Sequence, residues 1–148
     1  MSPLLTVPRT IFERAVIMDT SGFIALLHER RADSLGCQVT IDELRLPVFV
    51  TSFVIAETHR RILLDYGKRA ADDFLNHVYG GYFKVVRPQE EDESEARNLI
   101  AKYADKALSF CDALTASVML RLGILKVFTY DRKHFCSIGF EAIPPILF

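Results

Sequence analysis

The sequence predicts an α/β fold, a three-layer α/β/α sandwich with a mostly parallel central sheet. Short apolar runs of strand length alternate with longer amphipathic segments of helical length along the chain. Hydroxyl residues or proline stand where helices should begin, and glycines stand where several helices should end. Strands that alternate with helices in this way are typical of a parallel sheet with helices on its faces.

The first half of the chain is predicted to contain two buried strands. The first is an apolar run that ends at Asp19, and the hydroxyls of Thr20 and Ser21 favour a helix start directly after it. A second apolar run is also followed by hydroxyl residues and then by a longer helix. In chain order, the predicted elements are a strand at 15–18, a helix at about 20–28, a helix at 31–44, a strand at 47–50 and a helix that Thr51 or Ser52 caps and Gly67 ends.

The second half continues the alternation. Pro88 and the four acidic residues at 90–93 are typical of a helix N-terminus, where negative charge is favourable. Ser109 is the expected cap of the next helix, and Gly123 is its expected end. The predicted elements are a helix at 68–78, a strand at 82–86, a helix at 89–103, a helix at 110–122, a strand at 126–129, a helical turn at 132–136 and an edge strand at 140–143.

Length and composition indicate one globular domain. A chain of 148 residues can bury a real core, and we expect residues 15–148 to form a single domain behind an extended or disordered leader at 1–14. Half of the residues are apolar and a quarter are charged, which excludes an intrinsically disordered chain. The net charge of −1 gives no general attraction to nucleic acid, so that any such binding must come from local patches.

Cysteine usage and hydropathy favour a cytoplasmic location. Cys37, Cys111 and Cys136 are widely spaced and form no CxxC pair, so we expect core thiols in a reducing compartment rather than disulfides or a zinc site. No apolar run approaches the roughly 20 residues that span a bilayer, so we expect no membrane association. The first residues also lack the pattern of a secretory signal.

Four acidic residues are candidates for a catalytic site. They are Asp19 after the first strand, Glu57 in the middle of a helix, Asp112 near a helix start and Asp131 after a later strand. Each acid alone has an ordinary alternative. The two that follow strands could be helix caps. A capping box with Ser109 would explain Asp112. Glu57 lies on a helix face with apolar residues, and an ion pair with Arg61 at i+4 would explain it.

Taken together, the four acids favour a metal site. Two of them end parallel strands and two sit on helices beside those strands, so that all four could meet at one edge of the sheet. Carboxylates about 4 Å apart repel by several kcal/mol at an effective dielectric constant near 20, and a cation would remove this repulsion. Oxygen ligands and few histidines favour a hard divalent ion, Mg²⁺ or Mn²⁺. Such an ion activates water and neutralises phosphate charge, which suits phosphodiester hydrolysis.

The order and spacing of these residues resemble the PIN-domain family, which includes the VapC-type toxin ribonucleases of toxin–antitoxin modules. The matching pieces are Met18-Asp19-Thr20-Ser21, Ala56-Glu57-Thr58, Leu108-Ser109-Phe110-Cys111-Asp112-Ala113 and Thr129-Tyr130-Asp131-Arg132-Lys133-His134-Phe135. The resemblance covers nearly the whole chain apart from the leader.

The resemblance implies an endoribonuclease that depends on Mg²⁺ or Mn²⁺ and cleaves single-stranded RNA. The catalytic and metal-binding residues would be Asp19, Glu57, Asp112 and Asp131. The hydroxyls that would orient carboxylates or water are those of Thr20, Ser21, Ser109 and Thr129. Water would attack the phosphorus directly, without a covalent intermediate.

Basic residues near the acids are candidates for RNA contacts. They are Arg60 and Arg61 on the helix of Glu57, and Arg132 and Lys133 directly after Asp131. Phosphate contacts of this kind position RNA without reading its sequence, although a solvated helix face explains any single cluster as well. We assign no catalytic role to His59 or His134. We expect three aromatic side chains to be core residues, namely Phe53, Phe110 and Phe135.

The resemblance also implies a homodimer and an antitoxin protein as partner. The antitoxin would lie across the acidic cleft, in a groove formed by the helices of segments 21–44 and 51–64. Two alternatives stay open. One is a PIN-fold RNA-binding or scaffold protein with weak or partner-dependent nuclease activity. The other is an acid-cluster phosphatase or phosphoreceiver, which would normally carry a pair of acids where this chain has Met18-Asp19-Thr20.

Overall fold

A parallel sheet forms the centre of the molecule. The computed structural model describes residues 14–27 and 47–143, so that the predicted helix at 31–44 and nearly all of the predicted leader at 1–14 lie outside the described residues. The division into a leader and one domain stays a prediction. The strands are β1 (Val16–Met18), β2 (Val48–Thr51), β3 (Lys84–Val86), β4 (Lys126–Phe128) and β5 (Glu141–Ile143).

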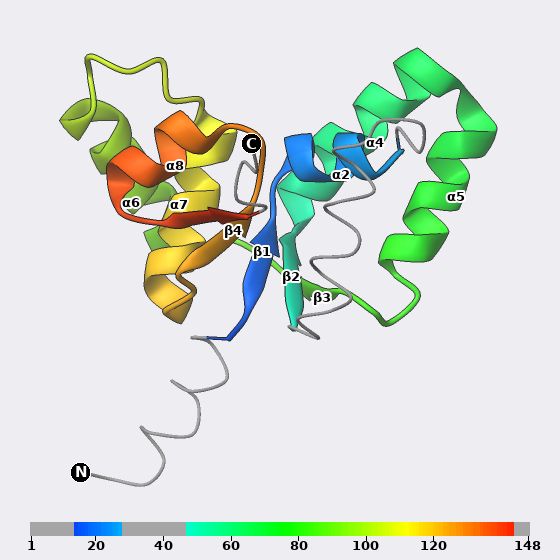
Figure 1. Ribbon diagram of the computed structural model, residues 1–148, viewed down its shortest axis with the longest axis horizontal. Coiled ribbons are helices and arrows are strands. Elements are labelled where there is room, and N and C mark those ends of the chain that lie inside the picture. Colours follow the sequence, from blue (N-terminus) through cyan, green and yellow to red (C-terminus); the bar gives the residue numbers. More distant parts are fainter. Residues whose placement is uncertain (1–13, 28–46, 144–148) are drawn as a thin grey trace, which may run out of the picture.

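The five strands stand in the order β3-β2-β1-β4-β5, and every neighbouring pair is parallel. Ile17 in β1 lies opposite Phe49 in β2 and Val127 in β4. The central strand β1 therefore has both neighbours in register (Figure 1). The predicted fold class is confirmed, with a sheet that is parallel throughout the described residues.

Helices cover both faces of the sheet (Figure 1). On one face pack α2 (Thr20–Leu27), α4 (Ser52–Tyr66) and α5 (Lys68–Val78), and on the other pack α6 (Glu90–Lys102), α7 (Phe110–Leu122) and α8 (Arg132–Ile138). Among these helices of residues 14–27 and 47–143, none has the combined length and apolarity that crossing a membrane requires.

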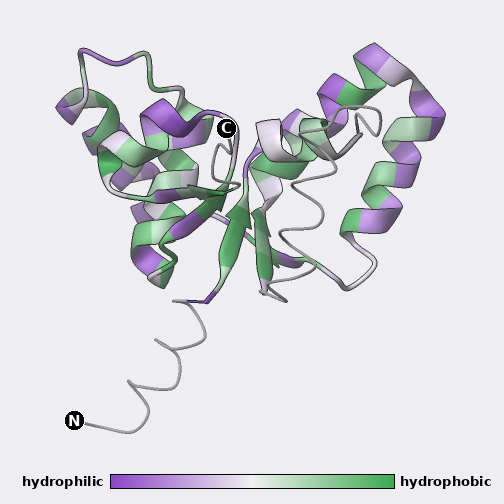
Figure 2. Cartoon of the chain, in the orientation of Figure 1, coloured by the Kyte–Doolittle hydropathy of each residue, from purple (hydrophilic) through white to green (hydrophobic). Residues whose placement is uncertain are grey.

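The side chains of β1 alternate between two hydrophobic cores. Val16 and Met18 enter the core that α2, α4 and α5 cover, whereas Ile17 enters the core under α6 and α7. Figure 2 shows hydrophobic strands between helices whose outer sides are hydrophilic. A strand that is buried on both faces must be apolar at every position, which explains the unbroken apolar run in this part of the sequence.

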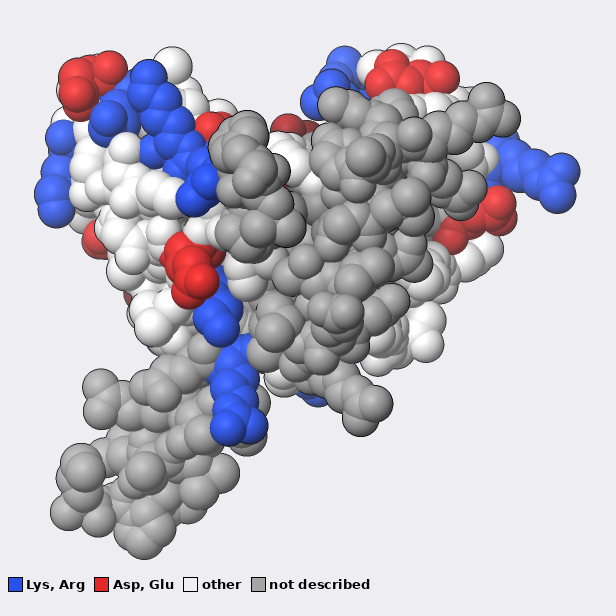
Figure 3. All heavy atoms as spheres, viewed as in Figure 1, with Lys and Arg blue, Asp and Glu red and all other residues white. Residues whose placement is uncertain are grey.

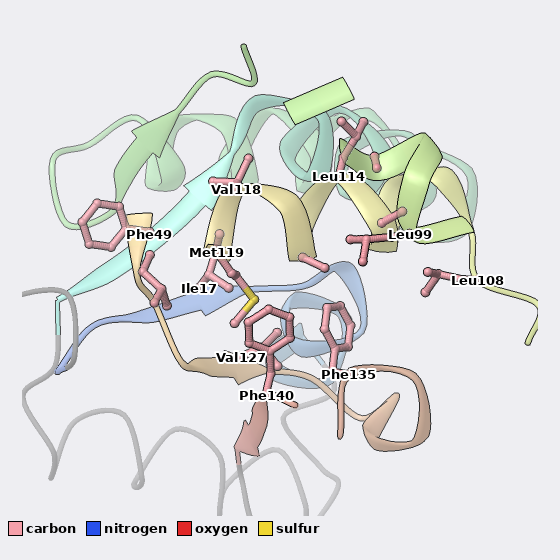
Figure 4. Close-up of a cluster of buried hydrophobic side chains, with 14 of the residues drawn as sticks. Ile17, Phe49, Leu99, Leu108, Leu114, Val118, Met119, Val127, Phe135 and Phe140 are labelled. Carbon is pink, nitrogen blue, oxygen red and sulfur yellow. The ribbon is translucent and has the colours of Figure 1, made fainter. Parts of the chain in front are cut away.

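Helix α7 is the most deeply buried helix of the second core. All of its residues from Ala113 to Met119 are buried. Figure 4 shows this core, in which Leu114, Val118 and Met119 belong to α7 and Phe135 belongs to α8. Because both helices pack on the same core, the residues at their first turns are held at fixed positions relative to the sheet.

A glycine lets α2 begin directly against the end of β4. A Cβ atom at Gly22 would lie 2.5 Å from the carbonyl oxygen of Phe128 and would also collide with the Phe128 ring. The N–H of Asp19 donates to the same carbonyl oxygen at 3.1 Å. A side chain at position 22 would push α2 away from β4, so this close contact is part of what positions Asp19.

Three predictions about apolar residues are wrong, the first because Cys136 is exposed and not a core thiol. The strand predicted at 82–86 begins only at Lys84, because Tyr82 is exposed and Phe83 turns inward to pack its ring against Phe23, with 5.4 Å between the ring centres. Phe110 is not a core residue, since 46% of it is exposed. It is the first residue of α7, and the buried part of that helix begins only at Ala113.

The remaining predicted elements agree with the structure to within about two residues at their ends, apart from the end of the first helix, since residue 28 lies outside the described residues. Phe135 is fully buried, as predicted, and Phe53 is half-buried against both cores.

Gly67 ends α4 and Gly123 ends α7, and both have positive φ. Ser109 caps α7, since its hydroxyl accepts the N–H of Asp112 at 3.0 Å.

A buried ion pair joins α6 to α7. Asp92 is 2% exposed, and both of its carboxylate oxygens accept hydrogen bonds from Arg121, the shortest at 2.9 Å. The N–H of Gln89 donates to the same carboxylate at 2.8 Å. Burial opposes ionisation of Asp92, but the Arg121 guanidinium and the Gln89 N–H outweigh it and hold the pKa of Asp92 below its ordinary value.

We predict that Asp92→Ala lowers the free energy of unfolding by about 2–4 kcal/mol, because it leaves a partly buried guanidinium without its partner. Urea unfolding followed by circular dichroism measures this change. In the wild type, the pKa of Asp92 is lower in the folded protein than its ordinary value of 3.8. The stabilisation that the ionised Asp92 carboxylate provides is therefore present above pH 3.8 and is lost as the pH falls through the folded-state pKa.

The control for this prediction is Glu93→Ala, in the same helical turn at an exposed position. It should cost less than about 1 kcal/mol, because only the helix-dipole interaction is lost. Equal losses in the two variants would show that the Asp92–Arg121 pair contributes nothing of its own.

Candidate metal centre

The candidate site lies beyond the carboxyl ends of β1 and β4. These two strands are neighbours, and the order of strands along the chain reverses between them. Ligands of open parallel sheets bind at such a reversal point. Asp19 directly follows β1, and Asp131 comes shortly after β4. The sheet therefore brings together two of the predicted acids from opposite ends of the sequence.

A network of hydroxyl groups holds Asp19. This residue is 4% exposed, and its Oδ2 accepts hydrogen bonds from Thr129 at 2.8 Å and from Ser21 at 3.2 Å. The two hydroxyl oxygens are 3.0 Å apart. Backbone groups complete the network, since the N–H of Asp131 donates to Thr129 Oγ1 at 2.9 Å and the N–H of Tyr130 donates to Ser21 Oγ at 3.0 Å.

The electrostatic surroundings of Asp19 favour its neutral form. Burial is the largest effect, and it raises the pKa of this carboxyl above its ordinary value. The hydroxyls of Thr129 and Ser21 act in the opposite direction, whereas the charge of Glu57 adds to the increase. Glu57 is thus close enough to Asp19 for its negative charge to raise the pKa of the Asp19 carboxyl.

Glu57 is exposed in α4, although the sequence places it on a helix face with apolar residues. Within the described part of the chain, Arg61 pairs with Asp65 at 3.9 Å and not with Glu57. The partner of Glu57 is the Cys111 thiol, whose pKa is raised first by burial and second by its hydrogen bond to the Glu57 carboxylate. This contact joins α4 to the first turn of α7.

Asp112 lies in that first turn, half-buried and close to the other acids. Burial and the charge of Asp19 are the two largest effects that raise its pKa to about 6. The Ser109 hydroxyl lowers the value, Asp131 raises it and His134 lowers it. The capping-box alternative is correct in part, because Ser109 does cap the helix, but the Asp112 carboxylate also belongs to the acidic cluster.

Asp131 has a histidine as its nearest partner. His134 Nδ1 lies 2.8 Å from Asp131 Oδ2 and 4.0 Å from Asp112 Oδ2. One ligand atom from each of these three residues can be chosen so that all lie within 4.8 Å of one another. Asp131 precedes α8 but makes no side-chain cap, so the helix-cap alternative does not explain its carboxylate.

The four residues whose hydroxyls are predicted to orient carboxylates or water differ in their surroundings. Ser21 and Thr129 contact Asp19 directly, and Ser109 contacts Asp112. The side chain of Thr20 is outside this network: its Oγ1 is buried and has no hydrogen-bond partner among the described residues. Its backbone N–H instead stabilises the Asp19 carboxylate.

The basic residues that are predicted to contact RNA lie at two sides of the acidic cluster, on α4 and at the start of α8. Arg60, Arg61 and Lys133 are exposed, and Arg132 is half-buried at the start of α8. The Nε of Arg132 is buried without a partner among the described residues. Figure 3 shows Lys and Arg side chains gathered over the end of the molecule that carries α8, and acidic side chains in the recess between the two halves of this face.

Sequence reasoning missed His134 and Cys111 as members of the site. The i, i+3 spacing of Asp131 and His134 on a helix start could have indicated their contact. Cys111 immediately precedes Asp112, but no pattern in the sequence shows that α4 brings Glu57 to it. That contact depends on how α4 and α7 pack.

The donor set fits a divalent ion. Four carboxylates influence one another, none of them has a Lys or Arg partner among the described residues, and the pKa values of Asp19 and Asp112 are raised. A cluster of this kind is stabilised by protons or by a cation. Asp19, Glu57, Asp112 and Asp131 would be the ligands, with the roles that the sequence analysis predicted for them.

Comparison with known proteins identifies the family of the chain. Residues 16–141 match the PIN domain. The chain belongs to the PIN-domain family. This match confirms the family predicted from the sequence and, with it, the nuclease class. No curated protein sequence matches the chain.

Solved structures support the fold. The PIN domain described here is similar to VapC20 of Mycobacterium tuberculosis, a toxin that cleaves the sarcin–ricin loop, with a TM-score of 0.76, 24% identity and coverage of 85% of this chain and 96% of the other. For VapBC2 of Rickettsia felis, bound to a promoter DNA fragment, the TM-score is 0.67 at 12% identity, with coverage of 86% and 96%. For FitAcB of Neisseria gonorrhoeae the TM-score is 0.65 at 14% identity, with coverage of 86% and 95%.

We predict that Asp112→Asn stabilises the protein in EDTA at neutral pH. Because the pKa of Asp112 rises from 3.8 to about 6 on folding, the wild type loses stability as the pH rises from 3.8 to about 6, and the ionised carboxylate opposes folding above that range. The stability of the variant relative to the wild type should therefore increase by about 3 kcal/mol between about pH 4 and pH 8. Urea unfolding at each pH measures the difference.

Asp105→Asn is the matched control, since Asp105 is exposed. Its stability relative to the wild type should stay constant with pH to within about 0.5 kcal/mol. A pH-independent difference for Asp112→Asn as well would mean that neither burial nor the neighbouring acids act on Asp112.

Proposed function

We propose that this PIN domain is an endoribonuclease that depends on Mg²⁺ or Mn²⁺, cleaves single-stranded RNA in the cytoplasm and is the toxin component of a toxin–antitoxin pair. The observation that carries the proposal is the cluster of Asp19, Glu57, Asp112 and Asp131 at the carboxyl edge of the sheet. The alternative of an RNA-binding or scaffold protein has no specific support, because all four acids are present and the charge of Glu57 acts on Asp19 while those of Asp19 and Asp131 act on Asp112.

The acids would hold the metal, and the hydroxyl network would hold the acids. A bound Mg²⁺ or Mn²⁺ would supply water activation and neutralisation of phosphate charge. Thr129 and Ser21 fix the orientation of Asp19 through their hydrogen bonds to Oδ2. Preorganised ligands of this kind do not have to rearrange when an ion binds.

Basic side chains at the two sides of the cluster would position the RNA. Arg132 is half-buried at the start of α8, and its guanidinium would donate to a phosphate oxygen. Lys133 is exposed beside it, and Arg60 and Arg61 are exposed on α4. Contacts to phosphates from both sides would hold the backbone of the RNA across the acids without selecting a sequence.

The proposed partners are an antitoxin and a second copy of this chain. Structures similar to this one include the toxin–antitoxin complex of Klebsiella pneumoniae and VapBC-1 of nontypeable Haemophilus influenzae. An antitoxin segment would dock against α2 and α4. Leu63 and Leu64 near the end of α4 are 42% and 68% exposed, which offers apolar contact area for such a segment.

Cleavage of a mixed set of single-stranded RNAs tests the proposal. We predict that the wild type cleaves in Mg²⁺ or Mn²⁺ and not in EDTA. Asp112→Asn should lower the rate at least about a hundredfold, because loss of a direct metal ligand should cost at least as much as loss of a supporting residue. Quantified gel electrophoresis of labelled RNA measures the rates.

The control variant is again Asp105→Asn, which should cleave at the wild-type rate. Cleavage that persists in EDTA, or in Asp112→Asn at the same rate, would contradict the proposed site. RNA binding without any cleavage would instead support the scaffold alternative.

We predict that Thr129→Val lowers the cleavage rate by about 10- to 100-fold, because the hydroxyl that orients Asp19 is lost. Thr129→Ser keeps the hydroxyl and should keep most of the activity. Steady-state rates of the two variants measure the effect. Equal losses in both would mean that the hydroxyl alone does not account for the effect, because Thr129→Ser keeps it.

A further inference from the structure

We propose that His134 supplies a nitrogen ligand to the divalent ion, together with carboxylate oxygens of Asp112 and Asp131. This inference rests on the proposed function, because it concerns the same ion. It changes the expected donor set from oxygen alone to oxygen and one imidazole nitrogen.

Two distances carry the inference. His134 Nδ1 lies 2.8 Å from Asp131 Oδ2 and 4.0 Å from Asp112 Oδ2. Octahedral ligands at about 2.0–2.1 Å from an ion are about 2.9 Å apart when they are adjacent and about 4.1 Å apart when they are opposite. Both distances from the nitrogen lie in the range that ligands of one ion span, and one ligand atom from each of the three residues can be chosen so that all lie within 4.8 Å of one another.

The other explanation of the shorter distance is a hydrogen bond that only orients Asp131. That explanation accounts for the 2.8 Å contact. It gives no role to Asp112, whose oxygen is too far from the same nitrogen for a hydrogen bond. An ion shared by the three side chains accounts for both distances.

The fold keeps these three groups together. His134 lies three positions after Asp131 at the start of α8. The buried side chain of Phe135 anchors this helix in the core. The side chains of His134 and Asp112 are 21% and 16% exposed, so both are mostly shielded from solvent. Water has less access to a site of this kind than to an acidic cluster on an open surface.

A nitrogen ligand has a consequence for metal preference. Mn²⁺ accepts an imidazole ligand more readily than Mg²⁺, which demands near-ideal octahedral geometry and keeps water and carboxylate oxygens as its ligands. The site should therefore bind Mn²⁺ more tightly than Mg²⁺, and His134 should be the reason. We expect His134→Gln to raise the Kd for Mn²⁺ about tenfold and to change the Kd for Mg²⁺ less.

Electron spin echo spectroscopy of the Mn²⁺-loaded protein tests the inference without any measurement of activity. We expect a ¹⁴N coupling from a directly bound imidazole in the wild type and its loss in His134→Gln. His77→Gln removes an exposed imidazole from α5, on the opposite face of the sheet, and should keep the coupling. Wild-type protein that carries ¹⁵N-histidine should show a ¹⁵N coupling instead, which tests the ligand without a substitution.

The outcomes separate this inference from the proposed function. Mn²⁺ binding without a nitrogen coupling overturns the role of His134 and leaves the metal-dependent nuclease in place. A coupling that persists in folded His134→Gln also overturns it. Failure of the wild type to bind Mn²⁺ at all overturns the role of His134, and only the additional absence of Mg²⁺-dependent cleavage overturns the proposed function.

Discussion

The hydrogen bond from Thr129 to Asp19 joins the carboxyl ends of the two central strands. The two residues are 110 positions apart in the sequence, and the bond is 2.8 Å long. Ser21 and the N–H of Asp131 converge on the same pair of side chains. The positions of Asp112 and Asp131 are defined relative to this point, because α7 and α8 pack on the same core as the strands that carry it.

The site is stable because the packing around it opposes the repulsion within it. The raised pKa values of Asp19 and Asp112 show that the folded state tolerates carboxylates where their charge is unfavourable. The two hydrophobic cores and the Asp92–Arg121 pair contribute the compensating stability away from the acids. The chain thus separates the residues that stabilise the fold from those that would bind an ion.

The sequence predicts the fold class and the four acids because each leaves a local pattern. Apolar runs mark strands, hydroxyls and glycines mark helix ends, and Asp19 and Asp131 follow strands that end at one edge of the sheet. Contacts between distant elements leave no such pattern. The bonds from Glu57 to Cys111 and from Asp92 to Arg121 depend on how whole helices pack, and the exposure of Phe110 depends on where α7 begins to touch the core.

The strand order β3-β2-β1-β4-β5 has a consequence for the synthesis of this protein. The strand at the centre of the sheet is made first, but its partner on one side, β4, is made only after most of the chain. Asp19 and Glu57 therefore leave the ribosome well before Asp112 and Asp131, and the acids cannot assemble during most of translation. The proposed ribonuclease would therefore be inactive while it is still a nascent chain beside ribosomal and messenger RNA.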